Sequence, residues 1–269
     1  MSAIDAKALL QSGNLEEALA QLQDQVRKNA ADPKLRVFLF QLLSVLGQWN
    51  RALTQLDVLG GFGADEHLMS RIFQPVVRCE ILRADIFAGK RTPVIFGEPS
   101  EWMSWLVQAN ELAARQQYGA ARVLRDKAFE AAPATPGKLN GNAFQWIADA
   151  DPRLGPVLEV IIEGSYFWVP MCRVKRMIVE PPTDLRDLVW APVQFIWANG
   201  GDASGHVPTR YPGTESSQDN QLRLSRRTQW SERDAGYSLG FGQRLLVTDH
   251  EEIPLLECRT IDLESGEET

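Results

Sequence analysis

Apolar residues recur at two spacings along the chain, helical in the first half and strand-like in the second. Up to about residue 132 they fall three or four positions apart, as they do on one face of an α-helix. Leu15, Ala18 and Leu22 belong to one such stripe, and Leu39 and Leu43 to another. A longer helix is predicted over residues 65–87, where a proline at position 75 would kink or split it. The first half is therefore predicted to be all helical.

A short pattern repeats within this helical half. Residues 13–18 and 47–52 both read Gly-x-large-x-x-Ala and start 34 positions apart, a period typical of tetratricopeptide-like hairpins. Residues 116–121 form a third copy with Gln in place of Gly, and an irregular helical pair is expected in the gap before it. Stacked hairpins of this kind bind peptides and helices. Any bundle of short helices would produce a similar pattern, and that alternative stays open.

The pattern changes at residues 133–141, which contain two prolines and two glycines and are predicted to link two domains. The helical domain would span residues 1–132 and the second domain residues 142–269. In the second domain short apolar runs are expected as strands at residues 157–162, 166–171, 176–179, 193–197, 244–248 and 255–261. Because no long helices alternate with them, a compact, mainly antiparallel and barrel-like α+β domain is predicted.

Composition narrows the class of protein. The net charge of −7 over 269 residues argues against nucleic acid as the main partner, because such proteins usually carry a basic face. No apolar run approaches the 18 residues of a membrane span, and the first residues lack an export signal. Three distant cysteines predict neither a disulfide framework nor a zinc site. We expect a cytoplasmic protein without a cofactor, a membrane or a nucleic acid as its partner.

One enzymatic motif appears near the end of the chain. Residues 236–240 match the Gly-x-Ser-x-Gly elbow of hydrolases, with Ser238 as nucleophile and His250 downstream as base. An elbow needs a strand before it and a helix after it, and here a charged segment precedes and a strand-like segment follows. A glycine-rich hairpin turn is therefore the favoured interpretation, and a serine hydrolase the alternative function.

Large aromatic and basic residues are the candidates for contact with a partner. Tyr, Trp and Arg are the residue types most enriched at binding hot spots. The candidates are Trp49, Trp190, Trp197, Arg210, Tyr211, Arg226, Arg227 and Trp230. Two alternatives stay open: the aromatic residues fill the core of a small domain, and the basic residues pair with neighbouring acidic ones.

Three segments together resemble the ImpE/TagJ family, which consists of accessory proteins of bacterial type VI secretion systems. They are residues 188–192 (Leu-Val-Trp-Ala-Pro), residues 208–213 (Pro-Thr-Arg-Tyr-Pro-Gly) and residues 249–257. The resemblance covers the whole chain and implies a cytoplasmic, non-enzymatic protein. It further implies binding to the small sheath subunit and to the sheath-recycling ATPase ClpV. The remaining alternative is a general repeat scaffold unrelated to secretion.

Overall fold

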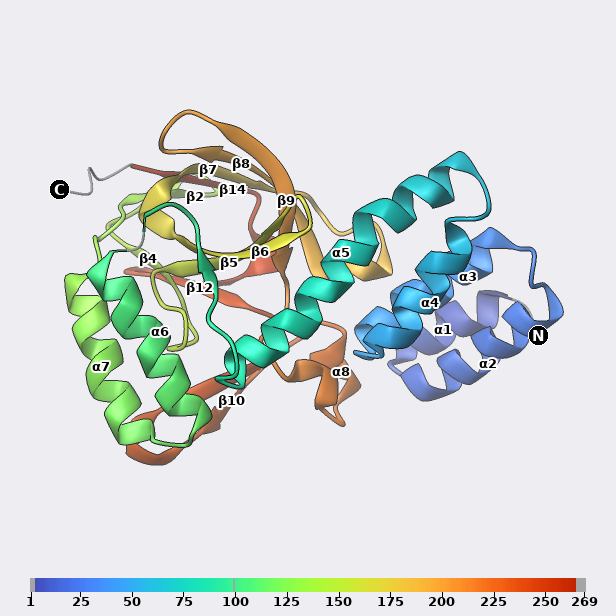
Figure 1. The fold of residues 1–269 in the computed structure, drawn as a ribbon, viewed down its shortest axis with the longest axis horizontal. Coiled ribbons are helices and arrows are strands. Elements are labelled where there is room, and N and C mark those ends of the chain that lie inside the picture. Colours follow the sequence, from blue (N-terminus) through green and yellow to red (C-terminus); the bar gives the residue numbers. More distant parts are fainter. Residues whose placement is uncertain (1–2, 99, 265–269) are drawn as a thin grey trace.

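A computed structural model describes residues 3–98 and 100–264 and combines a stack of helices with antiparallel sheets. Figure 1 shows α1 to α4 stacked at one end of the molecule and the sheets at the other, with α5 running between them. The helices α6 and α7 lie beside the sheets. The helices are α1 (Ala3–Ser12), α2 (Leu15–Lys28), α3 (Pro33–Val45), α4 (Trp49–Leu59), α5 (Ala64–Phe87), α6 (Glu101–Ala114), α7 (Tyr118–Ala131) and α8 (Asn220–Arg223).

The repeated sequence pattern corresponds to one repeated turn. In the α1–α2, α3–α4 and α6–α7 hairpins, the residue in the left-handed region is Gly13 (φ 82°), Gly47 (φ 66°) or Gln116 (φ 61°). In each turn this residue donates its amide to the carbonyl three positions earlier, and the next amide reaches the carbonyl five positions earlier. Such paired bonds satisfy carbonyls at the end of the first helix. The third copy thus adopts the same turn although it lacks glycine.

The rest of the pattern fills the seam of each hairpin. The small residue lets the two helix backbones approach, and it is fully buried in all three copies: Ala18, Ala52 and Ala121. Between the second and third hairpins lie α5 and the short strand β1 (Val94–Ile95), not the expected irregular helical pair. The hairpins are shown, while a tetratricopeptide architecture as such is not confirmed.

The long helix predicted over residues 65–87 is confirmed as α5, and Pro75 lies inside it. Pro75 packs against the turn between β5 and β6, because a Cβ on Gly164 would lie 2.5 Å from the Cβ of Pro75. Asp32 caps α3 by accepting a hydrogen bond from the amide of Lys34 at 2.9 Å. Local capping and apolar spacing thus place the helices where they form.

The described residues form a nine-stranded sheet in the order β1-β6-β5-β9-β8-β7-β14-β2-β3. Every pair in it is antiparallel except β1 with β6, which are parallel. Its strands after β1 are β2 (Gly137–Leu139), β3 (Asn142–Phe144), β5 (Val157–Ile162), β6 (Ser165–Pro170), β7 (Val174–Val179), β8 (Trp190–Trp197), β9 (Asp202–Pro208) and β14 (Thr260–Leu263).

The main sheet does not close into a barrel within the described residues. Its two ends, β1 and β3, are only two and three residues long and do not pair with each other. The barrel-like expectation is therefore not confirmed, whereas the mainly antiparallel arrangement is. Five of the six strand predictions overlap a strand over most of their length, and residues 255–261 instead start as a short 3-10 turn.

Two small sheets complete the fold. The strands β4 (Ile147–Asp149), β12 (Leu245–Thr248) and β13 (Glu252–Pro254) form one, and β10 (Thr228–Glu232) and β11 (Ser238–Gly242) form a two-stranded hairpin. The main sheet carries a core on each face. One core joins it to the helices through Trp168 and Trp190, and the other joins it to β4 and β12 through residues such as Phe195 and Leu246.

Candidate functional site

Four of the predicted contact residues lie in the interior. Trp190 is fully buried on β8, where its indole N–H donates to Glu80 at 2.9 Å and its ring lies 6.1 Å from that of Phe73. Trp197 is 5% exposed and stacks on Phe195, with ring centroids 4.8 Å apart. A partner would reach these two side chains only if the fold opened.

Arg210 is also buried, and it holds the end of α3. Its guanidinium donates to the carbonyls of Val45 at 2.7 Å, Ser44 at 3.3 Å and Arg223 at 2.7 Å. Burial lowers the pKa of Arg210 to about 10, so the side chain remains charged at neutral pH. A cation at the C-terminus of a helix interacts favourably with the helix dipole and with the unpaired carbonyls. The structural role of Arg210 is therefore to attach α3 to the second half of the chain.

Tyr211 is fully buried beside Arg210. Its hydroxyl accepts a hydrogen bond from the amide of Leu245 at 3.0 Å, and its ring lies against Gly240, where a Cβ would come within 2.4 Å. The ring of Trp230 packs 5.6 Å from it. Tyr211 thus packs against the inner side of the β10–β11 hairpin. The ring of Trp230, which is 37% exposed, packs on Tyr211 from the solvent side.

The two arginines after α8 that were predicted as contact residues, Arg226 and Arg227, are exposed, and both are bonded to other residues of the chain. Arg226 donates to the carbonyls of Leu10 and Gln11 at 3.0 Å each, at the end of α1. Arg227 pairs with Asp219. Together with Trp230, these are the predicted contact residues that reach the surface, while Trp49 is half-buried at the start of α4. They remain candidates for contact with a partner.

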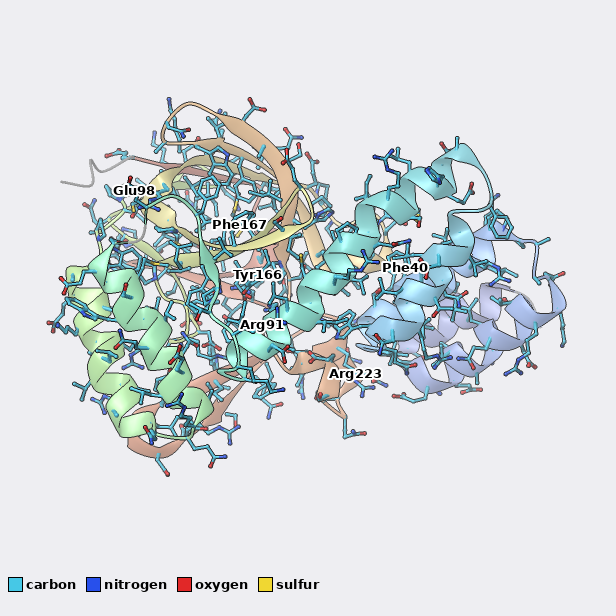
Figure 2. All side chains as sticks on the ribbon, viewed as in Figure 1. Phe40, Arg91, Glu98, Tyr166, Phe167 and Arg223 are labelled. Carbon is cyan, nitrogen blue, oxygen red and sulfur yellow. The ribbon has the colours of Figure 1, made fainter. Side chains whose placement is uncertain are left out.

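Residues 210–227 therefore form a clamp on the helical stack. In addition to Arg210 and Arg226, Asn220 donates to the carbonyl of Gly13 at 2.8 Å, and Arg223 pairs with Glu16 at 2.8 Å. Figure 2 shows Arg223 where α8 meets the first helices. The turn glycines of the first two hairpins, Gly13 and Gly47, thus lie against this clamp segment.

A buried charge network missed by the sequence analysis joins α5 to the sheets. Glu159 on β5 is fully buried and accepts from Arg83 of α5 at 2.6 and 2.8 Å, from Arg244 and from the hydroxyl of Tyr166. Burial alone would raise the pKa of Glu159, but the two guanidinium groups outweigh it and lower the pKa to about 2. Glu159 is the single charged residue of an otherwise apolar strand, which was the available sequence signal.

The network continues to a second carboxylate. Asp149 on β4 is buried and accepts from Arg244. Here burial outweighs the attraction of Arg244 and raises the pKa of Asp149 to about 6. On α5, Glu80 lies 3.4 Å from Arg83 and accepts the Trp190 bond. Every member contacts another member, so the cluster serves to hold α5 on the sheets.

The hydrolase motif does not form an elbow. Ser238 is the first residue of β11 and pairs across the hairpin with Glu232, so a strand and not a helix follows it. His250 is exposed in the loop after β12 and lies 3.3 Å from Asp249. Residues 236–240 thus form the turn and second strand of a hairpin, as favoured from the sequence. Within residues 3–98 and 100–264, no group of three or more His, Cys, Asp or Glu residues could hold a metal ion.

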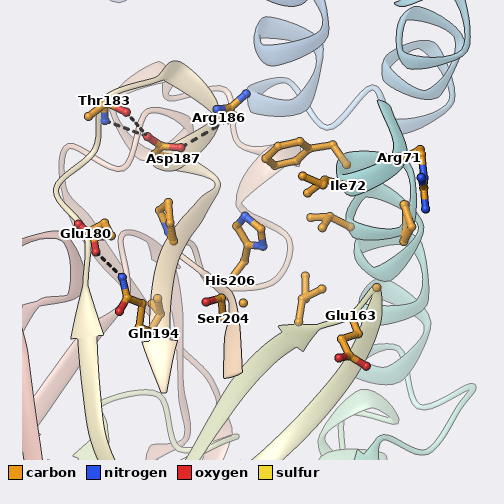
Figure 3. Close-up of a pocket in the computed structure, with 18 residues that line it drawn as sticks. Arg71, Ile72, Glu163, Glu180, Thr183, Arg186, Asp187, Gln194, Ser204 and His206 are labelled. Atoms are coloured by element: carbon orange, nitrogen blue, oxygen red, sulfur yellow. Dashed lines mark hydrogen bonds and ion pairs between the residues drawn. The ribbon is translucent and has the colours of Figure 1, made fainter. Parts of the chain in front are cut away.

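A cavity of about 710 Å³ lies between α5 and the β8–β9 hairpin. Figure 3 shows His206 of β9 in its centre, with Ile72 of α5 opposite and Thr183, Arg186 and Asp187 at one end. The imidazole of His206 contacts the ring of Phe73 edge-on, with centroids 5.4 Å apart. Burial and the nearby Arg186 lower the pKa of His206 to about 4, so the imidazole is neutral at physiological pH.

The helices within the described ranges include none that is long and apolar enough to cross a membrane. The fold thus combines helical hairpins, a buried charge network that holds α5 on the sheets and a cavity between α5 and the β8–β9 hairpin. Comparisons with known proteins show the family to which it belongs.

The family model described as ImpE protein matches residues 141–262. A Pseudomonas aeruginosa protein (strain PAO1) described as type VI secretion system accessory component TagJ is 48% identical over 262 residues, which is 97% of this chain and 92% of that protein. A crystal structure of the Vibrio parahaemolyticus protein VPA1032 superposes with a TM-score of 0.89 at 25% identity, covering 97% of this chain and 98% of that one. The chain belongs to the ImpE family, as its sequence segments indicated.

Proposed function

We propose that this protein is a non-enzymatic accessory component of a bacterial type VI secretion system. The observation that carries the proposal is the 48% identity, over 97% of the chain, to a protein that bears this description. Similarity over nearly the full length favours a shared role of the whole molecule and not of one module. The absence of an elbow around Ser238 agrees with a role in binding, since the strongest enzymatic motif serves as a hairpin.

The partners in this proposal are the small sheath subunit and the ClpV-type ATPase that recycles the sheath. The family resemblance is the reason for naming them, and an adaptor for two cytoplasmic machines would itself work in the cytoplasm. We further propose that residues 1–132 and 142–269 act as two units joined by residues 133–141. The clamp segment keeps both units in one orientation, so a partner bound to either unit is held at a fixed place relative to the other.

The exposed predicted residues offer a first contact surface. Trp230 is 37% exposed on β10, and Arg227 is exposed immediately before that strand. Trp and Arg are residue types enriched at binding hot spots. In this proposal the β10–β11 hairpin contributes to the contact, and the buried Tyr211 supports it from within.

Binding of the purified full-length chain to each purified partner tests the proposal. We expect at least one of them to bind with a dissociation constant of about 10 µM or tighter, equivalent to about 7 kcal/mol. The Trp230→Ala variant should weaken that binding, whereas the exposed Val123→Ala on α7 serves as a matched control. Failure of both partners to bind at about 100 µM would contradict the proposal. Ester turnover abolished by Ser238→Ala would instead favour the hydrolase alternative.

A further inference from the structure

The strand β9 has an unpaired edge beside the cavity. The strand β8 pairs with β9 along its whole length, whereas β5 pairs with it only through Gly205 and His206. Among the strands of the described ranges, β8 is the only one that pairs with residues 202–204. An unpaired strand edge presents amides and carbonyls to which another chain can bind.

The free backbone groups at this edge point away from β8. The amide of Trp197 donates to the carbonyl of Gly201 at 2.8 Å, and this bond fixes which residues of the hairpin are hydrogen-bonded to each other. Hydrogen-bonded and non-bonded pairs alternate along antiparallel strands. Ser204, which lies opposite Gln194, therefore directs its amide and carbonyl outwards. They face the side on which β5 ends at Ile162.

An apolar wall faces the same space. Ile72 of α5 is 44% exposed and lines the cavity, as does Val76 one turn further along the helix. Phe73 continues the wall to His206. Exposed apolar side chains that border a cavity with a polar rim are typical of a binding surface. The neutral His206 adds no charge to this wall.

We propose that an extended peptide segment of a partner protein adds to the edge of β9 and places an apolar side chain in the cavity against Ile72. The amide and carbonyl of Ser204 pair with the backbone of this segment. An extended segment meets all of these features, because it offers free backbone groups and alternating side chains. A helix uses its own backbone groups internally and would leave the β9 edge unpaired. The inference rests on the proposed protein-binding function and adds a site to it.

Selection from a displayed library of random 12-residue peptides on the full-length protein tests the site without knowledge of the partner. Enriched peptides are synthesised and their affinities measured by fluorescence polarisation. We expect Ser204→Pro, which removes the outward amide without breaking a bond to β8, to weaken binding about tenfold, the effect of about one lost hydrogen bond. Ser204→Ala keeps the amide and should bind as the wild type does. Ile72→Asp should also weaken binding, and unfolding curves check that each variant is folded.

Methylation of single backbone nitrogens in the peptide provides a second test that leaves the protein unchanged. We expect one or two positions at which methylation weakens binding about tenfold. The inference is overturned if no peptide is enriched, or if the enriched peptides tolerate Ser204→Pro and every methylation. A sheath subunit or ATPase that binds wild type and groove variants equally would overturn this site alone. Peptides that require Ser204, together with no binding of either partner, would support the site and overturn the proposed function.

Discussion

Replacement of Glu159 by Gln is the sharpest test of the buried charge network. Glu159→Gln preserves the size of the side chain and removes the charge that faces Arg83 and Arg244. The pKa of Glu159 falls from its ordinary value of 4.5 to about 2. Because a tenfold change in proton affinity is worth about 1.4 kcal/mol, the ionised carboxylate stabilises the fold by about 3 kcal/mol at neutral pH. Breaking a buried ion pair costs about 3–5 kcal/mol in general, so both estimates agree.

The dependence of this loss on pH gives a second check. Since the folded pKa lies below the ordinary value, the stabilisation is complete above pH 4.5 and is lost as the pH falls towards 2. Urea unfolding of wild type and Glu159→Gln at pH 7, 5, 4 and 3 should give a difference that shrinks below pH 5. Asp262→Asn, which breaks an exposed pair with Arg176, serves as control and should cost only a small part of that loss. A variant within about 1 kcal/mol of wild type at pH 7 would refute this account of the network.

Three further pairs of measurements follow from the same structure. Burial raises the pKa of Asp149 from 3.8 to about 6, so its ionisation lowers the free energy of unfolding as the pH rises from 4 to 7. In urea titrations, the free energy of unfolding of Asp149→Asn should therefore depend less on pH over this range. Gly47→Ala should lower the thermal midpoint, because φ is 66° and the new Cβ would lie 2.5 Å from Glu215, whereas Gly119→Ala, in open space, should raise it slightly. Trp190→Ala should cost about 3–5 kcal/mol of unfolding free energy in urea denaturation and Trp230→Ala under about 1 kcal/mol; equal losses would contradict the assignment of core and surface.

The sequence was sufficient for the elements that are determined locally. The apolar spacing located α5, and the Gly-x-large-x-x-Ala pattern located three turns, including the one at Gln116, where the packing overrides the preference for glycine. Short apolar runs located β5 and β6. These predictions depend on residues within one or two turns of each other, for which the period of the pattern is informative.

The candidate site was predicted less well, for a physical reason. Arg210 and Tyr211 were selected because their residue types are common at hot spots, yet the same types also occupy interiors when their polar ends find partners. The acceptors of Arg210 lie at Ser44 and Val45, far away in the sequence. The β9 edge is equally invisible from the sequence, because it depends on where β5 stops pairing.

The clamp segment has a consequence for how this family can vary in evolution. Helical repeat arrays usually lengthen or shorten by whole units, because each unit contacts only its neighbours. Here Arg210 holds the end of α3 and Arg226 holds the end of α1, each from a fixed position in the second half of the chain. An added or deleted hairpin would move one helix end away from its arginine. The number of N-terminal hairpins is therefore expected to stay constant among relatives that keep both arginines, even where loops differ in length.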